Sequence, residues 1–352
     1  RQVRGEPDGR LVGLGMGIFN EQAAHGTAVY SAWGIPMIPG YEQASVRFTP
    51  DGGLEVRVGI QCHGQGSETT LAQVAHEILG LDIESIKIVH GDTELSPYST
   101  GTWGSRAMVM SGGAVATACE KLCERIQLIG AHLLQAELED TQVEDGYVKA
   151  PSGQISLIDV ARTWYHRPQD LPADVDRQGL EVTAGYKPRR DDGTFSYAAH
   201  AAVLAIDPHF GTVEIIKYVV VEDGGVLINP MIVDGQILGG AAQGIGTALY
   251  EEMPFDENGQ PLFSTLADYV LPGATEVPNI HIEHMETPSP YSLFGQKGIG
   301  EGGAIGSVAA VTNAVNDALF RVGAEVCETP MTPRRILTAI QDAKAKHEGI
   351  GT

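Results

Sequence analysis

Alternating apolar and polar residues predict a β-hairpin near the start of the chain. The stretch ASVRFTPDGGLEVRVGI (residues 44–60) holds two alternating runs on either side of Pro50-Asp51-Gly52-Gly53, a typical turn sequence. The second run places its apolar side chains on one face: Leu54, Val56, Val58 and Ile60. Two more hairpins are predicted, one where Asp207-Pro208-His209-Phe210-Gly211 joins two apolar runs, and a small one around FDENGQP (255–261).

After the first hairpin, apolar residues recur at helical intervals. This pattern predicts a helix from about Ser67, its N-cap, to Leu79, and Gly80 ends it. The strand SIKIVHGDT (85–93) comes next, and then a long helix over 112–134. That helix repeats its apolar residues at helical intervals: Val115, Leu122, Ile126 and Leu133.

The second half of the chain contains two further helical patterns. The stretch GQILGGAAQGIGTALYEE (235–252) predicts a glycine-rich loop that leads into a helix. A C-terminal helix is predicted over 303–320, with Asn313, Asn316 and Asp317 facing away from the core. Its apolar stripe is Ile305, Val308, Val311, Val315 and Leu319.

The order of these elements predicts an α+β fold with two mixed sheet-and-helix subdomains. Each half combines hairpins with one or two helices, and no short-period repeat is present. The polar stretch HRPQDLPADVDRQG (166–179) carries two prolines and lacks periodicity, which is typical of a connection between domains. We therefore predict subdomains at 1–170 and 171–352.

Composition narrows the classes of partner. The formal net charge of −22 opposes binding to nucleic acid or to anionic lipid surfaces. No apolar run approaches the ~20 residues of a membrane span, and no signal peptide opens the chain. The four cysteines have neither iron–sulfur nor CxxC spacing, so we expect free thiols and a cytoplasmic protein. The first residue is Arg1 rather than Met, which is expected of a trimmed or excised chain.

Four glycine-rich stretches share one design. They combine glycines with amide, hydroxyl or charged residues ahead of a helix: CHGQGSETT (62–70), GTWGSRA (101–107), GGAAQGIG (239–246) and GQKGIGEGG (295–303). Glycine lets the main chain approach a ligand closely, and N–H groups at a helix start favour an anion. They could be simple turns, but Gln and Ser recur where turns favour Asn or Asp. Together they predict one large, polar, anionic ligand.

Two familiar motifs do not apply. Gly298, Gly300 and Gly303 spell G-x-G-x-x-G, but TPSPYSLFGQK before them is no strand, and Glu301 would face the pyrophosphate. NAD binding is therefore not expected. GQGSE and TWGSR lack the G-x-S-x-G arrangement, so a serine hydrolase is not expected either.

Glu301 is the one carboxylate among the glycines of the fourth stretch. A helix N-terminus favours the ionised carboxylate, and flanking glycines leave room for a ligand to touch it, which suits a general base. Alternatively, Glu301 only caps the helix. Residue type alone leaves both interpretations open.

Taken in order, these motifs resemble those of the molybdenum hydroxylases, the family of xanthine dehydrogenase, aldehyde oxidase and carbon monoxide dehydrogenase. The similarity is to the C-terminal molybdopterin-binding half of the large subunit, and it covers nearly the whole chain. It rests on GLGMGIFNEQAAHG, GQGSETTLAQ, VHGDTELSPYSTGTWGSR, GGAV, HAAVLAIDPHFGTV, EDGGVLINP, GQILGGAAQGIGTALYEE, DYVLP and KGIGEGGAIG.

The resemblance implies a molybdenum–molybdopterin cofactor, in its cytosine dinucleotide form, with the metal held by the pterin dithiolene and not by residues of this chain. The implied cofactor contacts come from the four stretches: Gly64, Gln65, Gly66, Gly104, Ser105, Arg106, Ala107, Gln243, Gly244, Lys297, Gly298 and Gly300. Their amides and hydroxyls would bind pterin edges and phosphate oxygens.

The resemblance also implies that Glu301 is the catalytic base. It would take a proton from the water-derived oxygen that is inserted at an electron-poor carbon of an N-heterocycle or an aldehyde. Electrons would pass to 2Fe-2S and FAD groups on partner chains, since this sequence shows neither cluster ligands nor a flavin motif. The other molybdopterin-binding half would be a third partner, so the chain alone should be inactive. Carbon monoxide is not an expected substrate, because the residues after Glu301 differ from that enzyme's.

One alternative function, which is not enzymatic, remains. The chain could be a non-catalytic scaffold or assembly subunit that keeps the fold without the cofactor. Molybdenum and pterin analysis of the purified complex separates the two hypotheses.

Overall fold

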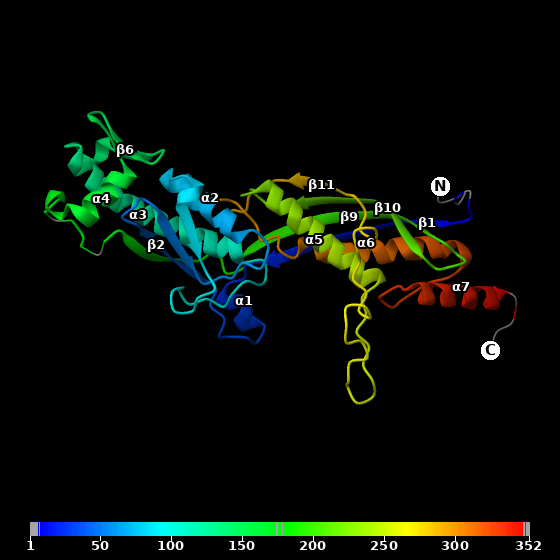
Figure 1. The fold of residues 1–352 in the computed structure, drawn as a ribbon. Helices are drawn as coiled ribbons and strands as arrows, with labels where there is room; N and C mark the ends of the chain where they lie inside the picture. Colours follow the sequence, from blue (N-terminus) through cyan, green and yellow to red (C-terminus); the bar gives the residue numbers. More distant parts are fainter. Residues whose placement is uncertain (1–5, 7, 174, 178, 348, 350–352) are drawn as a thin grey trace.

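The structure, a computed structural model, describes residues 6, 8–173, 175–177, 179–347 and 349. Two bodies of sheet and helix follow one another along a long axis (Figure 1). Each has its own cluster of buried apolar residues. The α+β prediction is confirmed. None of the helices within the described ranges has both the length and the apolar character that a membrane crossing requires.

The first body is built on a four-stranded sheet. Its strand order is β4 (Ile86–Val89), β3 (Leu54–Val58), β2 (Glu42–Phe48) and β8 (Glu181–Tyr186). β2 and β3 pair antiparallel around the predicted turn, so the first hairpin is confirmed. Helices α2 (Ser67–Leu79) and α3 (Gly112–Leu133) bury the apolar faces of these strands, because their own apolar residues repeat at helical spacing.

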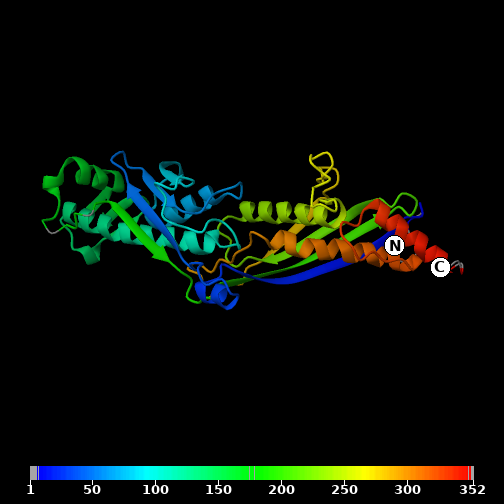
Figure 2. The ribbon, with the colours of Figure 1, turned by 90° about the horizontal axis from the view of Figure 1, so that it is seen from below.

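The second body is a longer sheet with helices on one face. Its order is β1 (Leu11–Ala23), β9 (Thr194–Ile206), β10 (Val213–Asp223) and β11 (Ile280–Met285). The predicted hairpin at Asp207–Gly211 joins β9 to β10 and is confirmed. Helices α5 (Pro230–Leu249) and α6 (Gly302–Leu319) lie side by side on this sheet (Figure 2).

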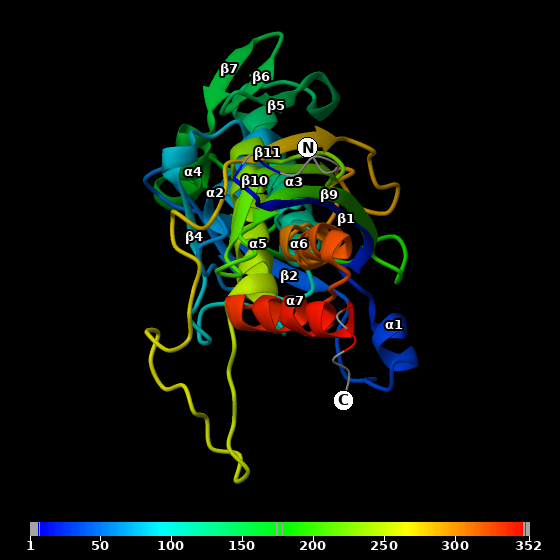
Figure 3. The same cartoon turned by 90° about the vertical axis from the view of Figure 1, so that its right-hand side faces the viewer.

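Smaller elements complete the fold. Five residues of π-helix (Ala107–Ser111) lead directly into α3. Further elements are α1 (Thr27–Ala32), α4 (Leu157–His166), α7 (Pro333–His347) and a small sheet of β5 (Gln142–Glu144), β6 (Tyr147–Ala150) and β7 (Gly153–Ser156). Short 3-10 helices lie at Ile83–Ser85, Leu138–Asp140, Pro168–Asp170 and Phe320–Val322. Helix α7, which crosses the far end of the second body (Figure 3), was not among the predicted elements.

The sheets do not follow a division of the chain at residue 170. β1 pairs with β9 over thirteen residues of each strand, so the start of the chain belongs to the second body. β8 pairs with β2, so residues 181–186 belong to the first body. Residues 174 and 178 of the predicted connection lie outside the described residues.

Glycines let the helices of the second body pack at backbone distance. On β1, Gly13, Gly15 and Gly17 face α6; a Cβ on Gly15 would lie 2.1 Å from the carbonyl oxygen of Ala310. The stretch 239–246, predicted as a loop before a helix, lies inside α5 instead. The prediction was wrong because a glycine run can serve close packing as well as a turn: a Cβ on Gly240 would lie 2.8 Å from the backbone of α6.

The same packing changes the predicted core face of α6. Its buried residues include Gly306, Ala310 and Ala314, whereas Ile305 is 42% exposed. The predicted stripe was therefore wrong at Ile305, because small residues, not large ones, face β1 and α5. Val311, Val315 and Leu319 are buried as predicted.

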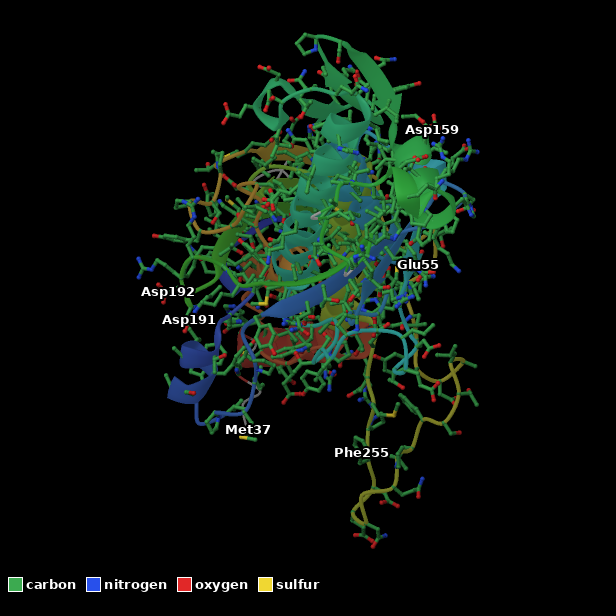
Figure 4. The ribbon with its side chains drawn as sticks, turned by 90° about the vertical axis from the view of Figure 1, so that its left-hand side faces the viewer. Met37, Glu55, Asp159, Asp191, Asp192 and Phe255 are labelled. Carbon is green, nitrogen blue, oxygen red and sulfur yellow. The ribbon has the colours of Figure 1, made fainter. Side chains whose placement is uncertain are left out.

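Two apolar surfaces of the second body are uncovered. The sheet face opposite the helices exposes Leu14, Met16 and Ile18 of β1. Residues 250–279 form an arm that extends away from the body (Figures 3 and 4), and its predicted small hairpin is reduced to one bridge, between Phe255 and Pro261. Phe255 is exposed and lies on this arm (Figure 4).

We predict opposite effects for the same substitution at two positions of α5. Gly240→Ala should lower the free energy of unfolding by about 1–3 kcal/mol, because its methyl group overpacks the contact with α6. Gly235→Ala meets no atom within 4 Å and should raise it by about 0.5–1 kcal/mol through helix propensity. Urea unfolding of both variants measures the difference; equal effects would contradict the packing argument.

Candidate functional site

Loops from both bodies enclose one cavity. It lies where the start of α2 meets the start of α5, near the middle of the molecule (Figure 1), and its volume is about 300 Å³. The lining comes from residues 60–71, 102–108, 224–236 and 296–301, which include three of the four predicted stretches. A second, shallower depression between α5 and α6 shares Gly300 and Glu301 with the cavity and contains Gln243.

The first loop brings backbone N–H groups together at the start of α2. Gly64 and Gly66 have positive φ angles, so glycine fits this loop without strain. The N-cap of α2 is Gly66 and not the predicted Ser67, because the chain enters the helix from a left-handed residue. Although burial opposes it, N–H donors of Gly64, Ser67 and Glu68 lower the pKa of Cys62, so these groups already converge on one acceptor.

The second loop is held by a buried ion pair. The Arg106 guanidinium, 2% exposed, hydrogen-bonds Glu42 and donates to the carbonyl oxygen of Gly101 at 3.0 Å. Its other nitrogen donates to the carbonyl oxygen of Tyr41 at 3.2 Å. The Arg106 side chain thus points into the protein and fixes the loop, so the predicted cofactor contact from this residue would have to come from its backbone.

Glu301 stands at the position where the two bodies meet. It lies just before α6, is exposed, and makes no hydrogen bond from its side chain to the helix amides. The Ser105 hydroxyl instead donates to Glu301 Oε2 at 2.9 Å and accepts the N–H of Glu301 at 3.2 Å. The capping interpretation therefore does not describe this side chain, which remains accessible in the cavity.

Two further carboxyl groups lie behind Glu301. Glu21 is half-buried near the end of β1, and its Oε1 lies 3.1 Å from Ser105 Oγ. Burial, a hydrogen bond to Glu301 and that residue's charge raise the pKa of Glu21 to about 7. Glu222 is 0% exposed, and neither of its oxygens has a hydrogen-bond partner among the described residues. Burial, then the charges of Glu21 and Asp223, raise the pKa of Glu222 to about 8.

The nearby cation is committed to a different carboxylate. Lys297 Nζ lies 2.8 Å from Asp223 Oδ1 in a buried ion pair and 4.6 Å from the centre of the Tyr197 ring. Burial of Asp223 opposes its ionisation, yet hydrogen bonds from Lys297, Thr287 and Tyr197 hold its pKa well below the usual range. Lys297 therefore does not neutralise Glu222 or Glu21.

Most predicted site residues come together, and one does not. The cavity wall contains Gln65, Gly104, Ser105, Arg106, Ala107, Lys297, Gly298, Gly300 and Glu301. Gly64 and Gly66 flank it on the first loop. Gly244 is buried inside α5, where a Cβ would lie 1.7 Å from Ser307 Oγ, so helix packing accounts for a glycine at this position.

The hydrogen-bond donors around the cavity suit a polar, anionic cofactor. The N–H groups at the start of α2, which converge beside Cys62, and the amide side chains of Gln65 and Gln236 lie around it as donors. Gly64 and Gly239 have no atom within 4 Å of a Cβ position, so open space lies beside the backbone there. A ligand could approach the main chain closely at both points.

Sequence reasoning missed Glu21 and Glu222, although a signal was present. Glu21 shares its strand face with Gly13, Gly15 and Gly17, because side chains two apart in a strand point the same way. Glu222 likewise follows the buried Tyr218 and Val220 on β10. Assigning the inner face of these strands from the sequence would have placed both acids in the interior.

We predict that breaking the buried Arg106–Glu42 pair destabilises the fold strongly. Arg106→Met should cost about 3–5 kcal/mol of unfolding free energy, because it leaves the Glu42 carboxylate buried without its partner. The double variant Arg106→Met/Glu42→Gln should recover part of this loss. Chemical denaturation of the three proteins tests the pair; equal stability of the single and double variants would argue against it.

Glu222 should make stability fall as pH rises. Its pKa is raised in the folded state, so the native protein binds more protons than the unfolded chain between pH 4.5 and about 8, and stability declines over that window. Glu222→Gln should therefore raise Tm at about pH 9 and change it little at about pH 5. Thermal unfolding at both pH values measures this; an equal shift at both would show that ionisation is not the cause.

Comparison with known proteins assigns the chain to a family. A family model described as "Molybdopterin cofactor-binding domain" matches residues 1–278. The large subunit of nicotine 6-hydroxylase from Paenarthrobacter nicotinovorans is 37% identical over 96% of this chain and 41% of its own length. The large chain of carbon monoxide dehydrogenase from Hydrogenophaga pseudoflava is 34% identical over 94% of this chain and 41% of its own.

A solved structure gives the same result. Quinoline 2-oxidoreductase from Pseudomonas putida 86 matches with a TM-score of 0.88 and 38% identity, over 97% of this chain and 43% of that one. The chain thus spans about two fifths of the length of these relatives. These matches show that the chain belongs to the molybdenum hydroxylase family and corresponds to a molybdopterin-binding part of its large subunits.

Proposed function

We propose that this chain supplies the cofactor-binding loops and the general base of a molybdenum hydroxylase. The observation that carries this proposal is the position of Glu301, an exposed carboxylate in the cavity that both bodies enclose. The Ser105 hydroxyl donates to the Glu301 carboxylate and accepts the backbone N–H of Glu301. The cofactor, when bound, would supply the two-electron oxidation. The chain's own part is to hold the cofactor, orient the base and move a proton.

Glu301 would accept a proton from the water whose oxygen enters the substrate. A base must be reachable by the reacting atom, and Glu301 fulfils this requirement because it faces both the cavity and the adjoining depression. The hydrogen bond from Ser105 Oγ occupies Oε2 and leaves Oε1 free of any bond from Ser105.

The cofactor would be molybdenum–molybdopterin in its cytosine dinucleotide form. Gln65, the N–H groups at the start of α2 and the backbone of residues 104–107 would bind it in the cavity. Gln243 extends the row of donors along α5 into the second depression, which suits a ligand longer than the pterin alone. Gly298 and Gly300 keep the loop beside Glu301 close to Ser105.

The proposed substrate is an N-heterocycle or an aldehyde with an electron-poor carbon. Relatives that match along nearly the whole chain carry the names of nicotine 6-hydroxylase and quinoline 2-oxidoreductase, both named for N-heterocycles. The cavity wall contributes apolar Ile60, Ile228 and Ile232 beside its polar groups, which suits a flat, largely apolar ring.

The chain would work in a complex with the other molybdopterin-binding half, an iron–sulfur subunit and an FAD subunit. The uncovered apolar strand face, Leu14, Met16 and Ile18, and the exposed Leu262 and Leu266 of the arm provide surfaces for the first of these partners. Named relatives are large subunits, which supports an assembly of several chains. We place this complex in the cytoplasm, consistent with four free cysteines.

Glu301→Gln tests the proposal directly. In the assembled enzyme it should keep molybdenum and pterin but lose about 10²- to 10⁴-fold in kcat, since the amide cannot accept the proton. Glu283→Gln, an exposed position on β11, is the control and should leave kcat unchanged. Metal analysis and turnover are measured on the same samples; Glu301→Gln with normal turnover would overturn the assignment of the base.

A further inference from the structure

The hydroxyl of Ser105 lies between two carboxyl groups. Ser105 Oγ is 3.1 Å from Glu21 Oε1 and 2.9 Å from Glu301 Oε2. A hydroxyl has one proton and can donate to only one acceptor at a time. If both acids were ionised, one of them would face the lone pairs of Ser105 and the charge of its neighbour without a bridging proton.

The surroundings of Glu21 do not supply a counter-charge. Ser196 donates to Glu21 Oε2 at a distance of 3.4 Å, and Glu222 lies behind it on β10. Lys297 is paired with Asp223. The titratable groups that face this region from the packed elements are Glu301 at the start of α6, Glu222 and the Asp223–Lys297 pair around β10, His25 after β1, and His200 on β9.

Both histidines are poor sources of positive charge here. Burial lowers the pKa of His25, with Glu301 opposing the shift, and burial lowers the pKa of His200 to about 4 despite a backbone hydrogen bond at Gly302. Near neutral pH His200 is therefore uncharged. A proton on the carboxyl pair itself remains the way to relieve the repulsion between Glu21 and Glu301.

We propose that Glu21 is a positioning residue for the base: Glu21 and Glu301 bind one proton between them, and Glu21 thereby sets the pH below which Glu301 no longer accepts protons. The inference rests on the proposed role of Glu301. While the pair holds this proton, Glu301 is not free to accept another. When the pair loses it, Glu301 becomes available as the base.

A pair of this kind titrates as a unit. Its two proton-binding steps belong to both residues and are separated because the second negative charge forms next to the first. Burial, the contact with Glu301 and the charge of Glu301 raise the pKa of Glu21 to about 7, which places the upper step close to neutral pH. Replacing Glu21 by Gln converts the pair into a single acid and removes the upper step.

The pH profile of the assembled enzyme tests this directly. Glu21→Gln, which keeps the shape and a hydrogen-bond donor, should move the acid limb of kcat/KM to lower pH by about one unit or more. Glu21→Asp keeps a carboxyl group and should retain an acid limb closer to that of the wild type. A purely structural role of Glu21 would lower activity at all pH values without moving the limb, and that result would overturn the proposal.

A second measurement needs no turnover. Because the folded-state pKa of Glu21 is raised, the native protein binds the extra proton between pH 4.5 and about 7, and the Tm of the wild type should fall as pH rises through this window. Glu21→Gln should show a smaller fall, both in the wild-type background and with Glu222→Gln already present. Glu283→Gln, on the exposed surface of β11, should show the wild-type fall. An unchanged fall in Glu21→Gln overturns the proposal.

The outcomes separate this inference from the function on which it rests. If Glu301→Gln abolishes turnover while Glu21→Gln leaves the acid limb and the Tm profile unchanged, Glu301 is the base and the shared proton is disproved. If Glu301→Gln keeps normal turnover, the proposed function fails first. Should Glu21→Gln not fold, infrared titration of Glu222→Gln decides: a protonated carboxyl band present at about pH 6 and lost by about pH 9 supports the pair, and its absence at pH 6 overturns it.

Discussion

The contact between the loops around Ser105 and Glu301 is the constraint on which the site depends. A Cβ on Gly298 would lie 2.1 Å from the carbonyl oxygen of Ser105, so the two backbones can approach this closely only without a side chain there. Ser105 itself has a positive φ of 52°, an uncommon conformation for a residue other than glycine. The two hydrogen bonds to Glu301 accompany this strained backbone.

The site also places three carboxyl groups close together, those of Glu222, Glu21 and Glu301, although neighbouring acids without a counter-charge lower the stability of a fold. Glu222 is buried without a hydrogen-bond partner among the described residues, and Glu21 lies between it and Glu301. Burial of an unpaired carboxyl group costs stability, and the protein reduces that cost by protonation. Arg106 and Lys297 could have offset the charge, but each is bound to a different acid, Glu42 or Asp223. Perturbed acids of this kind are typical of functional sites.

The sequence predicted local elements well and their contacts poorly. Alternation located the hairpins at residues 50–53 and 207–211, and helical spacing located α2, α3 and α6, because these signals depend on neighbours in the chain. The glycines of 239–246 could not be assigned in the same way, since the reason for them is the distance to α6. Glu21 and Glu222 were missed for a related reason: their roles depend on strand pairing between distant segments.

The crossing of the chain between the two bodies explains why the site lies where it does. The chain leaves the second body after β1 and returns to it before β9, and the two crossings touch: Gly26 donates its N–H to the carbonyl oxygen of Asp191 at 2.7 Å. Glu21 lies just before the first crossing, and Thr194, which accepts the N–H of Gly298, lies just after the second. These hydrogen bonds therefore join the two crossings to each other and to the loop that carries Glu301, because Gly298 is part of that loop.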